Sequence, residues 1–226
     1  PIMEMFLRGI GPSISVTVPA FMISVGFAIL IGLLVAYYRG RVVDRIVLVF
    51  CVIAMSIPSL AIILFGQHVL AYQMSLFPIS GYEESFPERI NYVLLPGLIW
   101  ILISIGVEIR FYRTAFLDES NQDYVRTARA KGLTEKKVYL KHVLKNSLVP
   151  ILTQVIIEIP FLILGSLLLE AFFGIPGLGS MIVDAINNSD FPVIKAMATI
   201  ISILFIFGQL LTDIMYKIVD PRVSLK

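Results

Sequence analysis

The chain has 226 residues, of which 58% are hydrophobic and 15% are charged, and its mean hydropathy is +0.89. Soluble domains are about half apolar and about a quarter charged, so this composition excludes an ordinary soluble domain and indicates a chain that lies in lipid. The formal net charge of +2 gives no case for nucleic acid as a partner. The single cysteine, Cys51, excludes an intramolecular disulfide and CxxC motifs.

Five apolar stretches are long enough to cross a bilayer as helices, because a spanning helix needs about 20 residues. They cover residues 14–37, 46–70, 92–112, 148–170 and 192–217. Pro19, Pro58 and Pro160 fall inside three of them and predict kinks. The sequence therefore predicts an all-α, polytopic membrane protein with a transmembrane domain over residues 14–217, between an external or interfacial segment and a short cytoplasmic tail. These flanking segments are residues 1–13 and 218–226.

Basic residues lie mainly on one predicted side of the membrane. Of the 18 Lys and Arg residues, only Arg8, Arg89 and Lys195 fall on the other side. Because cytoplasmic loops collect positive charge, we predict that the C-terminus and the long 113–147 loop are cytoplasmic and that residues 1–13 are external. No signal peptide precedes residue 14, so we expect one further helix upstream in the intact protein.

The 113–147 loop contains signals for two short helices. Ser120-Asn-Gln-Asp123 has the pattern of a capping box, which predicts a helix from there to about Lys131. Gly132 is typical of a residue just past a helix end, where the left-handed conformation is needed. Thr134-Glu135 favours the start of a second helix directly afterwards. The sequence therefore predicts a helix–elbow–helix that projects into the cytoplasm.

The first of these helices has a small apolar ridge on a basic surface. Tyr124, Val125 and Ala128 form the ridge, and we expect it to dock into a groove on a soluble partner. The alternative is that the basic loop only touches anionic lipid headgroups. No phosphate-binding loop or HExxH motif is present, and the topology places His68 and His142 on opposite sides of the membrane, so we expect no catalytic residue, cofactor site or metal site in this chain.

The loop sequence resembles a known family. Residues 123–146 read DYVRTARAKGLTEKKVYLKHVLKN, which is similar to the EAA loop of binding-protein-dependent ABC importer permeases of the dipeptide, oligopeptide and nickel branch. Residues 77–81, 170–179 and 220–223 resemble that branch's first external loop, a later external loop and its C-terminal signature, in the same order. The resemblance implies the type I importer permease fold and a loop that seats on a cytoplasmic ATPase subunit.

Carried over by position, the family's Glu-Ala-Ala falls on Arg126, Thr127 and Ala128, and its loop glycine on Gly132. Arg126 stands in place of the leading Glu and Lys145 in place of a later Pro; both departures are familiar in the peptide branch, and the loss of the Pro is more typical of its "B" permease than of its "C" permease. The implied ATPase-coupling residues are Tyr124, Arg126, Thr127, Ala128, Ala130, Gly132, His142 and Leu144.

The resemblance also implies partners and a place in the cell. They are two cytoplasmic ATPase subunits that bind ATP and Mg²⁺, an extracytoplasmic substrate-binding protein and a homologous second permease, with a homodimer as the alternative. The chain would be a multi-pass protein of a bacterial or archaeal cytoplasmic (inner) membrane that transports short peptides, with nickel or another small solute as the alternative. ATP would be hydrolysed by the partners, because this chain has no catalytic site of its own.

Several ionisable groups are predicted at membrane depth. An unpaired charge there is costly, so Glu158 is expected to face protein or water, and with Gln154, one turn earlier, it is a candidate for the translocation path. A hydrogen-bonded structural Glu158 is the alternative. If ion gradients rather than ATP drove a secondary transporter, Glu158 would be its coupling site. Glu170 matches a family position at the external mouth, as a gate or a loop anchor. Glu108 and Asp213 are expected to pair with basic neighbours, Arg110 and Lys217.

Overall fold

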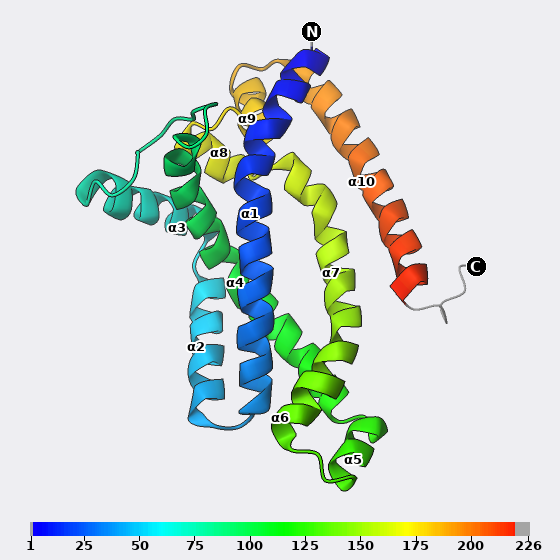
Figure 1. Cartoon of the computed structure of the whole chain (residues 1–226). Coiled ribbons are helices and arrows are strands. Elements are labelled where there is room, and N and C mark those ends of the chain that lie inside the picture. The colour runs from blue at the N-terminus through cyan, green and yellow to red at the C-terminus, as the bar shows by residue number, and fades with distance from the viewer. Residues whose placement is uncertain (1, 220–226) are drawn as a thin grey trace. The chain divides into compact units, whose positions relative to one another are not determined.

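The computed structural model describes residues 2–219, except for the side chains of residues 2, 160, 164, 212, 213 and 215–219. Over the described range all regular structure is helical, as Figure 1 shows. In chain order the elements are α1 (Ile2–Tyr37), α2 (Val42–Ser56), α3 (Ser59–Gly66), the π-helix η1 (Gln67–Gln73), α4 (Arg89–Ser120), α5 (Asp123–Ala130), α6 (Glu135–Val138), the π-helix η2 (Tyr139–Val143), α7 (Leu144–Leu164), α8 (Leu167–Phe173), α9 (Leu178–Asn187) and α10 (Phe191–Val219).

Four helical stretches are long and apolar enough to cross a membrane. They are Met3–Tyr37, Arg89–Ser120, Glu135–Ile163 and Phe191–Leu211. Two further pairs of helices pass the same test together but are broken by a bend, so the described chain has up to six such segments if each pair counts as one. Several helices of this length and hydrophobicity are typical of a polytopic membrane protein.

The chain folds into two compact units. Unit 1 comprises the chain before Ser24 together with Ile57–Ile103 and Glu158–Leu210, and unit 2 comprises Ser24–Ser56, Ser104–Ile157 and the chain after Leu210. Each unit has its own buried apolar side chains.

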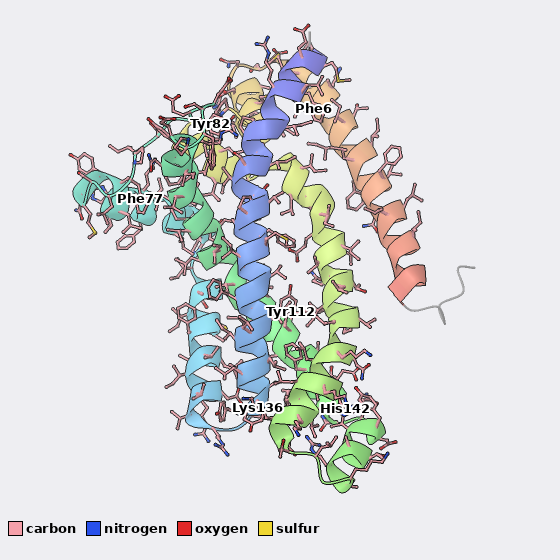
Figure 2. All side chains as sticks on the ribbon, viewed as in Figure 1. Phe6, Phe77, Tyr82, Tyr112, Lys136 and His142 are labelled. Atoms are coloured by element: carbon pink, nitrogen blue, oxygen red, sulfur yellow. The ribbon has the colours of Figure 1, made fainter. Side chains whose placement is uncertain are left out.

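Unit 2 is built on close helix contacts. A Cβ at Gly32 would lie 3.3 Å from the backbone nitrogen of Arg113, and one at Gly106 would lie 3.2 Å from the carbonyl oxygen of Cys51. Glycine at these two positions lets α4 approach α1 and α2 closely, as in many membrane bundles. Tyr112 and Phe116 of α4 are fully buried in the resulting core, and Figure 2 shows where Tyr112 lies along α4.

An ion pair in the same unit joins the start of α2 to α4, and a hydrogen bond ties the turn between α1 and α2 to the same carboxylate. Arg113 Nε lies 2.9 Å from Asp44 Oδ1 and Arg113 Nη2 lies 3.0 Å from Oδ2, while the backbone N–H of Gly40 donates to Oδ2 at 2.8 Å. Asp44 is 4% exposed, and its buried carboxylate is paired with the Arg113 guanidinium through a bidentate contact.

Unit 1 holds a bent helical hairpin and the connection that precedes α4. Helices α8 and α9 meet at an angle of 80°, and Gly174, which caps α8, has the left-handed φ of +63° that such a turn requires. The Gly81 N–H donates to the Phe173 carbonyl at 2.8 Å, and the Gln67 amide donates to the carbonyls of Ile79 and Phe172. The 74–88 connection is thereby tied to α8 and to η1.

Three of the predicted stretches have a different form in the structure. Residues 1–13 were predicted outside the first span, but α1 is one continuous helix from Ile2 that passes through Pro19. At Pro58 the predicted kink is a full interruption between α2 and α3. The predicted stretch 148–170 is divided after α7, because Gly165 has a φ of +70° and Ser166 caps the next helix through Leu169 N–H. The side chain of Pro160 lies outside the described residues.

Candidate functional site

The predicted helix–elbow–helix of the 113–147 loop is present as α5 and α6, but the prediction that Ser120 caps the first helix is wrong. Helix α4 continues through Ser120, whose hydroxyl donates to the Leu117 carbonyl at 2.8 Å. Gln122 is the extended residue before α5, and its carbonyl accepts the first N–H bonds, from Val125 and Arg126. Ser120 cannot act as the cap because it is still bonded within the last turn of α4.

The elbow forms at Gly132, as predicted. Gly132 has a φ of +80°, and its N–H donates to the Arg129 carbonyl at 2.9 Å. A Cβ there would meet nothing within 4 Å, so glycine is required by backbone conformation and not by space. Thr134 precedes α6 as predicted, although its side chain makes no capping bond, and Arg129 closes the elbow by an ion pair with Glu135 at 2.8 Å.

The predicted docking ridge points mainly inward, which corrects the expectation that it faces a partner. Val125 is 0% exposed and Ala128 is 5% exposed, and both pack into the core of unit 2 with Val138 and Tyr139. An amphipathic helix turns its apolar positions to the nearest apolar surface, and here α6, η2 and α4 provide that surface. Only Tyr124 of the ridge is exposed, at 39%.

The outward face of α5 therefore differs from the predicted ridge. Among the coupling residues implied by the resemblance, the exposed ones are Tyr124, Arg126, Thr127, Ala130 and Gly132. His142 on η2 and Leu144 at the start of α7 are half-buried, and Lys136 and His142 both lie in the loop region at one end of unit 2 (Figure 2). The structure gathers these residues in one small α5–elbow–α6–η2 assembly.

Tyr124 is held at the exposed edge of α5. Its hydroxyl donates to the Glu119 carboxylate, and partial burial together with this bond raises the pKa of Tyr124 to about 12. Both causes favour the neutral phenol. Tyr124 is therefore uncharged across the physiological pH range.

Glu170 is buried and surrounded by backbone donors in unit 1, which favours the anchoring role over the gating role at the external mouth. Its side chain is 1% exposed. Oε2 accepts from the N–H of Gly179 at 2.7 Å and of Ser180 at 3.3 Å, and Oε1 accepts from Ser166 N–H at 3.2 Å. One carboxylate thus joins the start of α8 to the start of α9.

The sequence reasoning missed the residues that make room for this carboxylate. Ser13 bonds to Glu170 and accepts from the Leu178 N–H at 2.8 Å. A Cβ at Gly165 or Gly177 would collide with the Glu170 carboxylate, and one at Gly179 would lie 2.8 Å from the Leu167 backbone. The three glycines close to Glu170 in sequence were an available signal, whereas Ser13 lies more than 150 residues away and gave none.

The other predicted polar groups belong to other elements of the chain. Gln154 and Glu158 are one turn apart in α7 and each is partly buried. Glu108 is 6% exposed and accepts from the Ser24 hydroxyl at 2.7 Å. His68 bonds to Gln73 at 3.2 Å and stacks on Tyr72, which suits a structural residue. Asp213, Lys217 and residues 220–223 lie outside the described side chains.

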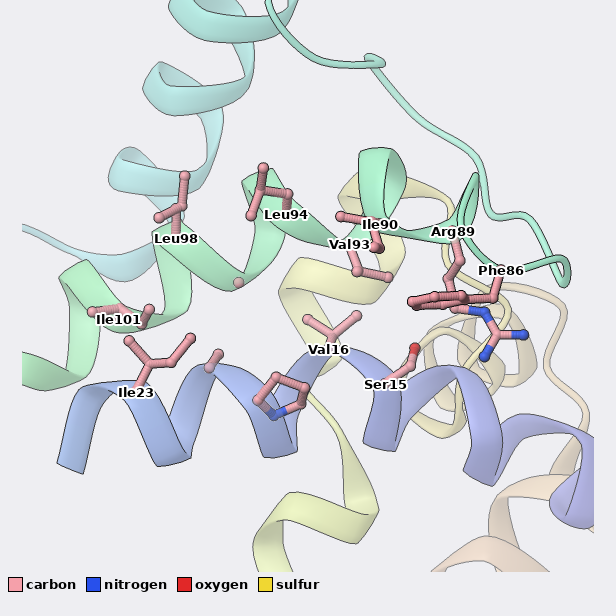
Figure 3. A pocket seen from close by; sticks show the side chains of 13 residues that line it. Ser15, Val16, Ile23, Phe86, Arg89, Ile90, Val93, Leu94, Leu98 and Ile101 are labelled. Atoms are coloured by element: carbon pink, nitrogen blue, oxygen red, sulfur yellow. The ribbon is translucent and has the colours of Figure 1, made fainter. Parts of the chain in front are cut away.

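An apolar recess of about 410 Å³ lies between α1 and α4 within unit 1. Figure 3 shows Val16 and Ile23 of α1 on one side and leucines of α4 on the other, with Ser15, Phe86 and Arg89 together at one end. The Arg89 guanidinium donates to the carbonyls of Glu83 and Glu84. The recess suits an apolar guest, and none of the residues singled out in the sequence as functional lines it.

Comparison with known proteins decides the family. Residues 28–225 match the family described as binding-protein-dependent transport system inner membrane component. The chain belongs to this family. It is therefore a membrane-spanning transport subunit, a permease, and the predicted ABC importer resemblance is confirmed.

Individual relatives of this permease cover almost the whole chain. It is 31% identical to the glutathione transport system permease protein GsiC of Salmonella choleraesuis, over 100% of this chain and 72% of the relative. It is 33% identical to the probable peptide ABC transporter permease protein y4tP of Sinorhizobium fredii, over 99% and 72%. It is 38% identical to the oligopeptide transport system permease protein AppB of Bacillus subtilis, over 92% and 66%.

A solved structure confirms the predicted fold class. A chain of the MetNI methionine ABC transporter, in an inward-facing conformation, superposes with a TM-score of 0.71 over 97% of this permease and 98% of that chain. The two sequences are 17% identical, so this likeness concerns the fold alone. The permease has the all-α fold of type I ABC importers.

Proposed function

We propose that this permease carries short peptides inward across a cytoplasmic membrane and is driven by two cytoplasmic ATPase subunits. The observation that supports the substrate class is that relatives covering more than nine tenths of the chain are named as peptide, oligopeptide and glutathione permeases. Glutathione is itself a small peptide. A homologous second permease and an external substrate-binding protein complete the proposed transporter, and nickel or another small solute is the alternative cargo.

The proposed contact with the ATPase is the exposed face of α5 and the elbow. Val125 and Ala128 hold α5 against unit 2, and the Arg129–Glu135 pair holds the elbow. A short helix that is held at both ends moves as a rigid element, so that movement of a bound partner would be transmitted to the rest of unit 2. In this proposal the buried residues position the contact, and the exposed Tyr124, Arg126, Thr127 and Ala130 make it. ATP and Mg²⁺ bind to the partner subunits, and the permease contributes no catalytic group.

The proposed orientation places this loop and the C-terminus in the cytoplasm. The stretch from Arg110 to Lys145, which includes most of this loop, carries nine basic and four acidic residues, and such an excess of positive charge is expected for a cytoplasmic loop. Gln154 and Glu158 are proposed to line the translocation path. Their partial burial in α7 suits groups that face protein or water at membrane depth.

Two glycine variants test the ATPase contact. Gly132 and Gly40 have nearly the same left-handed backbone, with φ of +80° and +78°, and a β-carbon added at either position would meet no atom within 4 Å. Valine at either position is strained, because a left-handed residue with a β-carbon costs about 1–2 kcal/mol. Gly132→Val alone alters the elbow, so Gly40→Val is the matched control.

The measurement is the amount of ATPase that co-purifies with the tagged permease when the whole transporter is expressed. We expect the wild type and Gly40→Val to retain the ATPase and Gly132→Val to lose most of it while still inserting in the membrane. Equal retention and normal transport in Gly132→Val would show that the elbow does not hold the ATPase.

A further inference from the structure

A groove of about 320 Å³ opens in unit 2 between the end of α1 and the second half of the loop. Leu30, Leu34 and Tyr37 line one side at helical spacing along α1. Lys136, Tyr139 and Leu140, from α6 and η2, line the other side. The groove therefore lies between a membrane helix and the elements that follow α5 and the elbow, where the ATPase contact is proposed.

The walls of the groove are fixed by contacts between aromatic side chains. The Tyr139 hydroxyl donates to the Ala36 carbonyl at 3.2 Å, and the rings of Tyr139 and Tyr37 meet edge to face with centres 5.2 Å apart. Leu30, Leu34 and Leu140 are nevertheless 65%, 48% and 50% exposed. The groove is thus a formed recess with an uncovered apolar lining.

Polarity changes along the groove. Leu30 lies seven residues before Tyr37, which is about 10 Å deeper along the helix axis. At the other end, Lys136 and Tyr38 line the recess. The Arg41 guanidinium lies 5.4 Å from the centre of the Tyr38 ring. Leucines at depth, tyrosines at the interface and cations beyond them follow the profile of one membrane leaflet.

The carboxylates nearest to these cations in the sequence already have other partners. Asp44 accepts from Arg113 at 2.9 Å and from the Gly40 N–H, and Glu135 accepts from Arg129 at 2.8 Å. Within the described residues neither Arg41 nor Lys136 forms an ion pair. The polar end of the groove therefore presents positive charge that is suited to an anion.

We propose that this groove binds one anionic phospholipid, with its phosphate held by Arg41 and Lys136 and an acyl chain along Leu30, Leu34 and Leu140. Arg and Lys are the usual protein ligands of phosphate, and basic pockets beside membrane helices bind acidic headgroups. A covering protein helix would use the leucines but would leave the two cations without a partner. Bound lipid would brace α6 and η2 against α1. The proposed orientation decides only which leaflet supplies the lipid.

The test counts bound lipid on the complete transporter by native mass spectrometry in mixed micelles of phosphatidylglycerol and phosphatidylcholine. We expect one tightly held phosphatidylglycerol per copy of this chain. The double variant Arg41→Gln with Lys136→Gln should bind it about tenfold or more weakly, because each basic residue near a headgroup contributes to the attraction. Lys137→Gln with Lys141→Gln removes the same charge from exposed sites that do not line the groove and should leave the affinity unchanged.

A further variant tests the apolar part of the groove. Leu34→Trp fills the recess without changing charge, and we expect it to displace the tightly held phosphatidylglycerol. Equal weakening by the two Gln pairs would reduce the effect to general surface charge and overturn the proposal, as would equal binding of phosphatidylcholine or full binding in Leu34→Trp. Because the measurement needs neither transport nor ATP, its failure is separate from failure of the proposed function.

Discussion

Glu170 shows how one residue organises a segment that its local sequence leaves flexible. The α8–α9 hairpin contains Gly165, Gly174, Gly177 and Gly179, whose conformational freedom makes ordering costly. Three backbone N–H groups, from the starts of α8 and α9, converge on the Glu170 carboxylate. The residue acts as a clamp that replaces the missing side-chain packing.

Removal of this carboxylate should destabilise unit 1. Glu170→Ala leaves three backbone donors without their acceptor, and a buried unsatisfied polar group costs about 1–3 kcal/mol. We expect the free energy of unfolding in mild detergent to fall by about 3 kcal/mol or more. Unfolding is measured by the fluorescence of Trp100, the single tryptophan. Glu88→Ala, at an exposed position, is the control. Equal stability of the two variants would contradict the clamp.

Single residues were predictable from sequence where their conformation depends on neighbours alone. Gly132 adopts the predicted left-handed turn because its φ is set locally by the end of α5. Ser120 fails as a cap because α4 extends further than the apolar pattern indicated, and its hydroxyl remains inside that helix. Ser13 was invisible because its contacts with Leu178 and Glu170 exist only in the fold.

Helix α5 illustrates the same limit for an element. Its apolar positions were correctly identified, but sequence alone does not say whether an apolar ridge faces the same chain or a partner. Val125 and Ala128 face the core of unit 2, so the exposed basic face becomes the candidate contact. The predicted stretch 148–170 is likewise divided in the structure, because Gly165, which lies within an apolar run, turns the chain.

Two alanines of α5 separate the inward and outward roles. Ala128 is buried and Ala130 is exposed, so the same change to Glu has different consequences. Ala128→Glu places a carboxylate in an apolar core, which costs several kcal/mol, and we expect limited proteolysis to cut the 113–147 loop rapidly. Ala130→Glu should leave the loop as resistant as in the wild type while weakening ATPase binding.

Both results are needed for this assignment of faces. Rapid cleavage of Ala130→Glu, or a protease-resistant loop in Ala128→Glu, would mean that α5 is rotated from the orientation described. Normal ATPase binding by a resistant Ala130→Glu variant would instead move the contact away from this face of α5.

At the scale of the molecule, composition and charge distribution predicted the class of protein and its fold. Apolar stretches long enough to span a membrane predicted an all-α membrane protein, because a helix satisfies all of its backbone hydrogen bonds within one segment when it lies in lipid. The motif order then identified the family, which the match over residues 28–225 confirms. Substrate selection is less accessible, because in the proposed transporter the path is shared with a second permease whose side chains are absent from this sequence.

The energy source is the central claim, and peptide uptake into proteoliposomes that contain the complete transporter tests it most directly. Uptake of a labelled oligopeptide, delivered by the substrate-binding protein, is measured with and without ATP on the side of the ATPases and with ionophores that dissipate ion gradients. The account predicts that uptake requires ATP and persists with the ionophores. Uptake driven by an ion gradient in vesicles that lack the ATPases would contradict it and would assign Glu158 to a secondary transporter.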